Sequence, residues 1–261
     1  MLIAQISDTH IDPENPNGGQ RLAALEQAVA DINGLAPLPD AVVHTGDLAH
    51  NGSDAKYRAA RGILAGLRCP FFPVAGNRDE PDLLRQFFPA GRPLAPEAPF
   101  FQYAVEDFPV RLIVLDTRHA EQNQGDFCEE RAAILAAALD AAPERPTALF
   151  MHHPPFEVVE STYPWQFVER GAIARLAAVL AGRRNVVRLF CGHTHRDARG
   201  AVAGVPAGSV PSLAVDLRLG DFAPGLETAP IYHLHRFDGT VFATDLRAAL
   251  PFAQEKGAAA E

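Results

Sequence analysis

The sequence predicts an α/β fold, and three observations support this. Three short apolar segments, each followed by a loop and then a helix-like segment or turn, fill the first 80 residues. Two more apolar segments later in the chain are each followed by histidine, at His152 and at His193. No linker-like stretch or internal repeat interrupts the 261 residues, of which 48% are hydrophobic. Strands that alternate with helices are typical of α/β proteins, so we expect one domain over residues 1–255 and a disordered tail over 256–261.

The first third of the chain holds the clearest helical pattern. Leu22, Leu25, Val29 and Ile32 are spaced three and four apart, which predicts one apolar helix face, and Pro37 ends this helix. A second helix is expected from an N-cap at about Ser53. The strands expected here are 2–6, 41–45 and 70–74.

The remaining elements are expected in the following order. Strands are expected at 100–105, 110–115, 147–151, 186–191, 198–205, 209–215, 231–237 and 240–246. Helices are expected at 130–139 and 172–180, and loops at 89–99 and 156–168, the second of which holds Tyr163, Trp165 and Phe167.

Metal-ligand residues follow the strands at the point where each strand ends. The residues concerned are Asp8, His10, Asp47, Asn77, His152, His193 and His195. Ligands bind at the carboxyl ends of strands in open α/β sheets, so we expect these side chains to meet there. Seven nitrogen and oxygen donors exceed the need of one zinc ion, and they suit two divalent ions that share a bridging carboxylate. Because the set has no thiolate, it favours Mn, Fe, Zn or Co.

Composition excludes several other functions. The formal net charge is −9 and no stretch is rich in Lys or Arg, which argues against nucleic-acid polymers and anionic membranes as partners. Three scattered cysteines fit a reducing compartment. A strand-like segment begins at Leu2 and no apolar run is long enough to span a bilayer. We therefore expect a cytoplasmic protein without a membrane anchor.

The order of these motifs resembles the calcineurin-like metallophosphoesterases, most of all their cyclic-nucleotide and glycerophosphodiester phosphodiesterases. The motifs are Asp8-x-His10, Gly46-Asp47, Gly76-Asn77, His152 before His153-Pro-Pro, and Gly192-His193-x-His195. The resemblance implies a four-layer α/β/β/α sandwich. It also implies that Asp8, His10 and His195 hold one metal ion, that Asn77, His152 and His193 hold the other, and that Asp47 bridges them.

The expected reaction is hydrolysis of a small phosphodiester by a hydroxide that bridges the two ions, in which Asp47 and Asn77 serve as ligands. Such ion pairs lower the pKa of water and neutralise phosphoryl oxygens. One position departs from the family: the motif His that follows Asn77 is Arg78 here. A guanidinium is a poor proton donor, but it can form bidentate hydrogen bonds to phosphate oxygens. We therefore expect Arg78 to stabilise negative charge in the transition state. Proton donation is left to water, to His153 or to no group.

Three alternatives remain open from the sequence. A phosphomonoesterase or pyrophosphatase would use the same centre, and the added charge of Arg78 suits it. A non-catalytic metal-binding scaffold would keep the fold without the motif His. A pairing of Arg78 with Asp79 or another acid would make Arg78 structural. A homodimer is also possible on resemblance, and the aromatic loop over 156–168 is expected either to cap the cleft or to form an oligomer contact.

Overall fold

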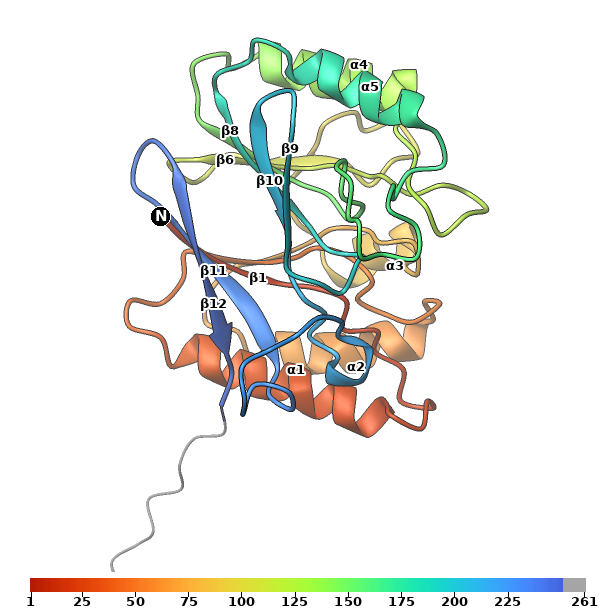
Figure 1. Ribbon diagram of the computed structural model, residues 1–261, viewed down its shortest axis with the longest axis vertical. Helices are drawn as coiled ribbons and strands as arrows, with labels where there is room; N and C mark the ends of the chain where they lie inside the picture. The colour runs from red at the N-terminus through yellow and green to blue at the C-terminus, as the bar shows by residue number, and fades with distance from the viewer. Residues whose placement is uncertain (251–261) are drawn as a thin grey trace, which may run out of the picture.

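Two β-sheets face each other between two layers of helices in the computed structural model (Figure 1). The structure describes residues 1–250, so the tail expected at 256–261 and the end of the expected domain lie outside the described residues. Helices α1 (Gly18–Asn33) and α2 (Asp54–Leu64) form one outer layer, and α4 (Glu129–Asp140) and α5 (Arg170–Leu180) form the other. The four-layer α/β/β/α sandwich implied by the resemblance is confirmed.

The first sheet has five strands in the order β12-β11-β1-β2-β3. Their bounds are β1 Leu2–Ile6, β2 Ala41–His44, β3 Phe71–Pro73, β11 Ile231–Phe237 and β12 Phe242–Ala248. Strands β1, β2 and β3 run parallel, because the helices between them carry the chain back across one face. Their carboxyl ends therefore meet at one edge.

The second sheet has seven strands in the order β4-β5-β6-β7-β8-β10-β9. Their bounds are β4 Arg92–Pro93, β5 Tyr103–Val105, β6 Arg111–Val114, β7 Thr147–Phe150, β8 Val186–Cys191, β9 Ala198–Val202 and β10 Val205–Ser209. The central strands β6, β7 and β8 are parallel. Both sheets therefore supply strand ends to the site, whereas the residue pattern alone suggested the edge of one sheet.

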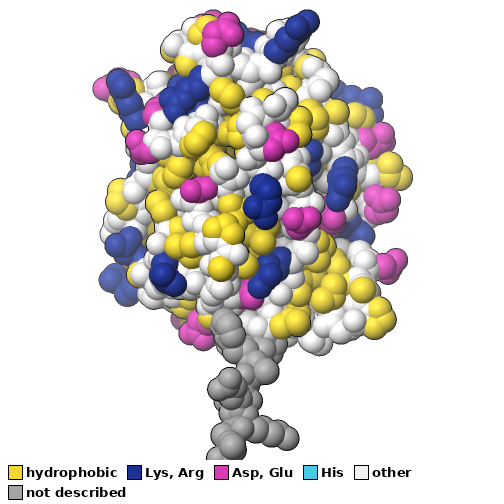
Figure 2. Space-filling model, turned by 90° about the vertical axis from the view of Figure 1, so that its left-hand side faces the viewer, with side chains coloured by type: hydrophobic (Ala, Val, Ile, Leu, Met, Phe, Trp, Pro, Cys, Tyr) yellow, Lys and Arg dark blue, Asp and Glu magenta, His cyan; other side chains and the backbone are white. Residues whose placement is uncertain are grey.

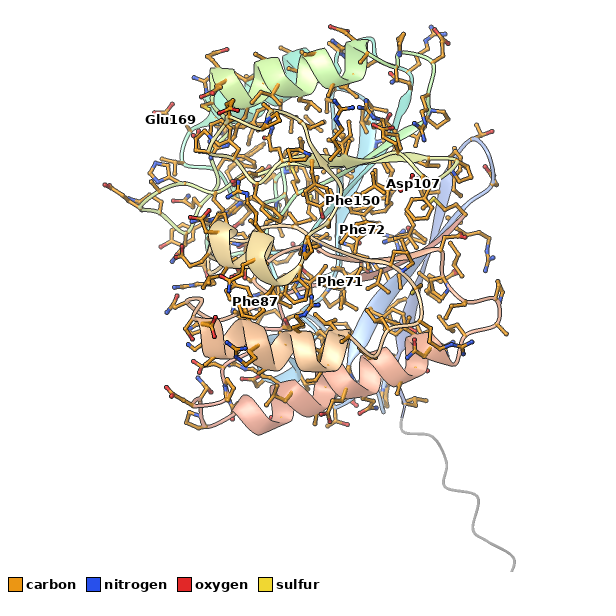
Figure 3. All side chains as sticks on the ribbon, turned by 180° about the vertical axis from the view of Figure 1, so that it is seen from behind. Phe71, Phe72, Phe87, Asp107, Phe150 and Glu169 are labelled. Atoms are coloured by element: carbon orange, nitrogen blue, oxygen red, sulfur yellow. The ribbon has the colours of Figure 1, made fainter. Side chains whose placement is uncertain are left out.

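Large apolar side chains hold the two sheets together. Phe72 of β3 and Phe150 of β7 lie between the sheets, as Figure 3 shows from behind. The Phe150 ring stacks on Phe190 of β8 with centroids 4.9 Å apart. A second core, which includes Leu135 and Leu176, lies between the seven-stranded sheet and helices α4 and α5. Burial of each such side chain contributes about 1.5–3 kcal/mol, so this packing fixes the distance between the strand ends.

Two of the expected strands were wrong. The expected strands 198–205 and 209–215 are replaced by a hairpin, β9 and β10, after which residues Val215–Leu217 form a short 3₁₀ helix. Ala203 and Gly204 both have positive φ angles, 49° and 81°, which is the turn that suits a two-residue hairpin. A Gly in the middle of an apolar run was the signal for this turn.

One helix was not expected from the sequence. Helix α3 (Pro81–Phe87) follows β3 after the loop that holds Asn77, and it contacts α2. Pro81 occupies its first turn, a position that proline favours because its missing N–H leaves no bond unmade. The short strand β4 likewise lies within the expected loop 89–99, at the sheet edge where Pro93 is tolerated.

The face that carries β11, β12 and the chain start has no cluster of one charge. Figure 2 shows basic, acidic and apolar side chains intermixed there, and no histidine among the side chains that the figure colours. None of the described helices combines the length and the apolar character that a bilayer crossing needs.

Candidate metal centre

All seven expected ligand residues come together where strands of the two sheets end. Asp8 and His10 follow β1, Asp47 follows β2, and Asn77 follows β3. From the other sheet, His152 follows β7, and His193 and His195 follow β8. The packing of the two sheets thus places donors from five strands around one point.

The backbone at this edge is strained. Of the seven non-glycine residues with positive φ angles in the part of the chain described, five are Asp8, His10, Asp47, His193 and His195. This left-handed conformation costs an L-residue about 1–2 kcal/mol, and such strain concentrates at functional sites. The strain turns each side chain from the strand direction toward the site.

Glycine makes the close approach of the strands possible. A Cβ atom on Gly192 would lie 2.1 Å from Oγ of Ser7 and 2.7 Å from Oδ2 of Asp8. The bare backbone at Gly192 lets the turn after β8 reach the turn after β1, where the His193 N–H donates to Asp8 Oδ2 at 3.0 Å.

The first group of donors contains Asp8, His10 and His195. Nε2 of His10 lies 3.3 Å from Nε2 of His195 and 3.9 Å from Oδ1 of Asp8. Nε2 of His195 lies 3.4 Å from the same Asp8 oxygen. These three atoms lie within 4.8 Å of one another and form one compact set of possible ligands.

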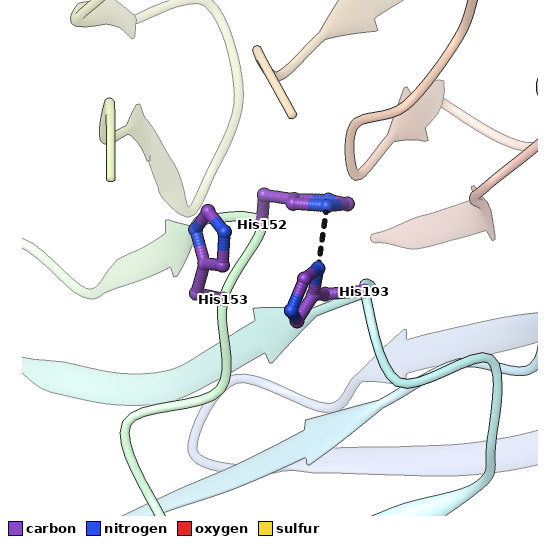
Figure 4. A group of neighbouring side chains, drawn as sticks. All are labelled: His152, His153 and His193. Atoms are coloured by element: carbon purple, nitrogen blue, oxygen red, sulfur yellow. Dashed lines mark hydrogen bonds between the residues drawn. The ribbon is translucent and has the colours of Figure 1, made fainter. Parts of the chain in front are cut away.

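The second group contains Asn77, His152 and His193. Nε2 of His152 lies 3.0 Å from Oδ1 of Asn77 and 3.1 Å from Nδ1 of His193. Figure 4 shows the His152 and His193 rings turned toward each other, with His153 beside them.

Asp47 lies between the two groups. Its Oδ2 is 3.5 Å from Nε2 of His10, and its Oδ1 is 3.5 Å from Nε2 of His152. The backbone N–H of Arg78 donates to Oδ1 at 2.8 Å and fixes the carboxylate. One carboxylate oxygen therefore faces each group, which is the arrangement of a bridging ligand.

The ligand atoms at this site suit bound cations better than hydrogen bonds with one another. His152 donates from Nδ1 to the Thr45 carbonyl at 2.7 Å, and His195 donates from Nδ1 to the Leu217 carbonyl at 3.0 Å. Each ring then has a lone pair on Nε2, and each lone pair faces an oxygen that only accepts. Oδ1 of Asp8 is buried and has no hydrogen-bond donor among the residues of the described range. Acceptors at such distances need a shared proton or a cation between them, and histidines oriented in this way are typical of metal ligands.

The pKa values reflect the same demand for positive charge. Burial alone would lower the pKa of His152, but the Asp47 carboxylate overrides burial and raises this pKa to about 9. Burial likewise acts against the charged form of His195, and the Asp8 carboxylate raises its pKa. For His10, burial prevails and lowers the pKa to about 4. Without metal ions, the positive charge near the Asp8 and Asp47 carboxylates comes from protonated histidines. A pair of divalent cations would supply that positive charge instead.

His153 lies next to the centre but is fully engaged by other groups. Its Nδ1 is 2.8 Å from Oγ1 of Thr117, and its Nε2 is 3.0 Å from the carbonyl of Asn123. Burial, followed by the neighbouring His152, lowers the pKa of His153 to about 3. The His153 ring thus links the loop around Asn123 to the segment that follows β7.

Arg78 lies on the wall of a cavity of about 540 Å³ that opens over the donors. Its Nη1 donates to Oδ1 of Asn51 at 3.2 Å. Within residues 1–250 the Arg78 side chain contacts Asn51 and forms no ion pair with an acid, whereas Asp79 accepts backbone N–H groups such as that of Gly76. The guanidinium remains available to an anion in the cavity.

The opposite wall of the cavity comes from two loops, one that follows β6 and one that continues beyond His152 after β7. It is formed by Gln122, Asn123, Gln124, Ser161, Thr162, Tyr163 and Gln166. Of the four aromatic residues of the 156–168 loop, only Tyr163 lines the cavity, and Phe156 is buried. Trp165 stacks with Arg170 at 4.4 Å, and Phe167 is buried. The sequence carried no signal for the amide residues, because side chains on irregular loops have no periodicity.

Asp79 is a further site residue that the sequence reasoning missed. Its buried carboxylate accepts the backbone N–H groups of Leu48 at 3.2 Å, Ala49 at 3.1 Å and Gly76 at 3.0 Å, and the Tyr57 hydroxyl at 2.9 Å. It therefore joins the loop of Asp47 to the loop of Asn77. An acid directly after the Gly-Asn-Arg turn was the available signal.

Two histidines outside the site have structural contacts. His44 is buried and pairs with Oγ1 of Thr9 at 3.0 Å. His235 lies 2.9 Å from Gln5 and from Thr244.

Comparison with known proteins agrees with this geometry. A family model of calcineurin-like phosphoesterases matches residues 1–197. The glycerophosphodiester phosphodiesterase GpdQ of Enterobacter lignolyticus is 35% identical over 207 residues, which cover 75% of this chain and 71% of that protein. A probable cyclic nucleotide phosphodiesterase of Rhodopseudomonas palustris is 34% identical over 249 residues, which cover 89% of this chain and 86% of that protein.

A solved structure shares the fold at much lower identity. A dimetal phosphatase from Danio rerio superposes with a TM-score of 0.71, at 13% identity, over 96% of each chain. The family model and the curated relatives lead to one conclusion: this chain belongs to the calcineurin-like phosphoesterase family, and its relatives are phosphodiesterases.

Proposed function

We propose that this protein hydrolyses a small organic phosphodiester with two divalent metal ions. The observation that carries the proposal is the position of Asp47, which turns one carboxylate oxygen to each of two donor groups. In this proposal Asp8, His10 and His195 hold one ion, Asn77, His152 and His193 hold the other, and Asp47 binds both. When bound, the ions lower the pKa of a water molecule and neutralise phosphoryl charge.

The protein's own residues bind and orient the phosphate. Arg78 reaches the cavity beside Asn77, and Asn51 holds its guanidinium through one nitrogen. The remaining guanidinium N–H groups suit two non-bridging phosphoryl oxygens, whose charge grows in the transition state. His153 has both ring nitrogens engaged, so its contacts favour a supporting role. The proposal therefore leaves protonation of the departing alcohol to solvent.

The far wall of the cavity favours a hydroxylated leaving group. Its side chains are amides and hydroxyls with one tyrosine, and none of the seven carries a charge at neutral pH. Groups of this kind donate to and accept from alcohols, whereas a nucleobase is bound best by flat apolar or aromatic surfaces. We infer that a glycerophosphodiester fits this wall better than a cyclic nucleotide. Relatives named for both substrate classes exist, so the choice between them is a direct test.

The test compares substrates on one metal-loaded preparation. With Mn²⁺ bound, we expect hydrolysis of bis(p-nitrophenyl) phosphate and of glycerophosphoethanolamine, and slower hydrolysis of 3′,5′-cyclic AMP. Faster turnover of cyclic AMP than of the glycerol diester would overturn the choice of substrate. Absence of turnover with two ions bound would overturn the enzyme proposal and favour the scaffold.

A phosphomonoesterase is the second candidate, and one observation favours it. Arg196 joins Arg78 on the cavity wall, and two guanidinium groups suit the extra charge of a monoester. Adding p-nitrophenyl phosphate to the panel decides this, because a phosphomonoesterase would hydrolyse it faster than bis(p-nitrophenyl) phosphate.

The identity of the metal ions, the domain bounds, the location in the cell and the oligomeric state are also part of the proposal. The thiolate-free donor set favours Mn, Fe, Zn or Co, and elemental analysis of the purified protein identifies the ions. A single domain over residues 1–255, a cytoplasmic location and a homodimer remain predictions, which limited proteolysis, cell fractionation and light scattering test.

A further inference from the structure

The metal-ligand histidines are oriented by unlike partners. His152 and His195 each donate their second nitrogen to a backbone carbonyl, that of Thr45 and that of Leu217. His10 has no carbonyl partner of this kind among the described residues. Its Nδ1 lies 3.3 Å from Nδ1 of His50, a half-buried residue in the loop that follows Asp47.

We propose that His50 is a positioning residue: it accepts the Nδ1–H of His10 and so keeps the Nε2 lone pair of His10 directed at the first cation site. The inference rests on the proposed function only in requiring that the centre binds two cations. It concerns a residue that lies outside the five sequence motifs.

The tautomers follow from the positions of the two rings. Nε2 of His10 faces Asp47 at 3.5 Å and His195 at 3.3 Å, so this nitrogen must carry the lone pair if it is to bind a cation. The proton of the neutral ring is then on Nδ1 and needs an acceptor. Nδ1 of His50 is the acceptor in reach, which places the proton of the His50 ring on its own Nε2. The two rings are tilted by 54° with centroids 5.5 Å apart, which is not a stacked arrangement.

His50 is held in place by its backbone. Its N–H donates to the Ile11 carbonyl at 3.1 Å, and the His10 N–H donates to the Asp47 carbonyl at 2.9 Å, so the two loops are paired. Lys56 donates to the His50 carbonyl at 2.6 Å and to Asp12 at 2.9 Å. The backbone of His50 is thus held by two contacts, and the pairing of the two loops keeps its ring next to His10, as a positioning residue requires.

Two variants separate hydrogen bonding from packing. His50→Phe keeps a flat ring but removes the acceptor. His50→Asn is smaller but keeps an acceptor, because Oδ1 of asparagine occupies the place of Nδ1 of histidine. Mn²⁺ binding is measured by calorimetric titration of the metal-free full chain and by electron paramagnetic resonance of the bound ions. Thermal unfolding of the metal-free variants serves as the folding control.

We expect the wild type to bind two ions and His50→Asn to bind both within about threefold of it. We expect His50→Phe to bind one of the two ions about 10- to 100-fold more weakly, which is the usual effect of losing the group that orients a ligand. Equal binding by His50→Phe and wild type, or equal losses in both variants, would overturn the role of His50 alone. A wild type that binds fewer than two ions would overturn the proposed function and this inference with it.

Discussion

The two walls of the active-site cavity differ in how their residues are held. The ligand wall follows five strand ends, is buried, and has strained backbone at Asp8, His10 and Asp47. The facing wall comes from the loops around Gln122 and Ser161, which are more exposed and carry uncharged amides and hydroxyls. We propose that the ligand wall sets the chemistry and that the loop wall sets which leaving group fits. The following predictions test this division.

Asp47→Asn should have the largest effect, because it removes the charge shared by both donor groups while keeping the side-chain shape. We expect kcat for bis(p-nitrophenyl) phosphate to fall roughly 1,000-fold, at the upper end of what one electrostatic group contributes to a rate. Asp245→Asn, the same change on the exposed strand β12, should leave kcat unchanged. A loss of less than tenfold in Asp47→Asn would contradict the bridging role.

Gly192→Ala should damage the ligand wall without changing a ligand. Its Cβ would lie 2.1 Å from Ser7 Oγ and 2.7 Å from Asp8 Oδ2, so the turns after β1 and β8 must move apart. We expect a loss of about 1–3 kcal/mol in the free energy of unfolding, together with weaker Mn²⁺ binding.

The matched control is Gly62→Ala in α2, where nothing lies within 4 Å of the new Cβ. This change should stabilise the protein by about 0.5–1 kcal/mol, because alanine favours helix over glycine. Chemical denaturation of both variants, combined with metal titration, checks the pair. Gly192→Ala with wild-type stability and metal binding would show that the two turns are not tightly packed.

Arg78→His should change the dependence of rate on the leaving group. A histidine at this position can donate a proton, which contributes about 100-fold or more when an alkoxide leaves and little when nitrophenolate leaves. We expect the ratio of kcat for glycerophosphoethanolamine to kcat for bis(p-nitrophenyl) phosphate to rise about tenfold. This is less than the full effect of a general acid, because the residues around position 78 do not hold a histidine ring in place. Arg78→Ala separates loss of the cation from gain of the donor, since it should lower both rates together. An unchanged ratio in Arg78→His would indicate that leaving-group protonation does not limit the rate.

Gln122→Ala should have the smallest effect, confined to the substrate. We expect KM for glycerophosphoethanolamine to rise about three- to tenfold with kcat unchanged, as loss of one neutral hydrogen bond predicts. KM for bis(p-nitrophenyl) phosphate, which has no hydroxyl groups, should stay the same. Gln20→Ala on the exposed face of α1 is the control. A drop in kcat would show that this wall takes part in the chemistry.

Much of the site was predictable because it lies on regular structure. The apolar run from Val186 to Cys191 ends at Gly192, and the pattern alone places His193 and His195 at a strand end. The helix expected from the spacing of Leu22 and Ile32 is present as α1. Where the pattern was ambiguous the prediction failed, as in the apolar run that Ala203 and Gly204 fold into a hairpin.

The sequence by itself determined which residue types stand at the strand ends. A strand buried on both faces appears as a continuous apolar run, and the turn after it appears as glycine and polar residues. Only the tertiary structure decided that two sheets share the centre, that Asp47 turns one oxygen to each donor group, and that Arg78 stays free of Asp79. It also decided the cavity wall opposite the ligands and the contact between His10 and His50. These features depend on how two sheets and several irregular loops pack against one another, and contacts between residues far apart in the chain have no period that a sequence displays.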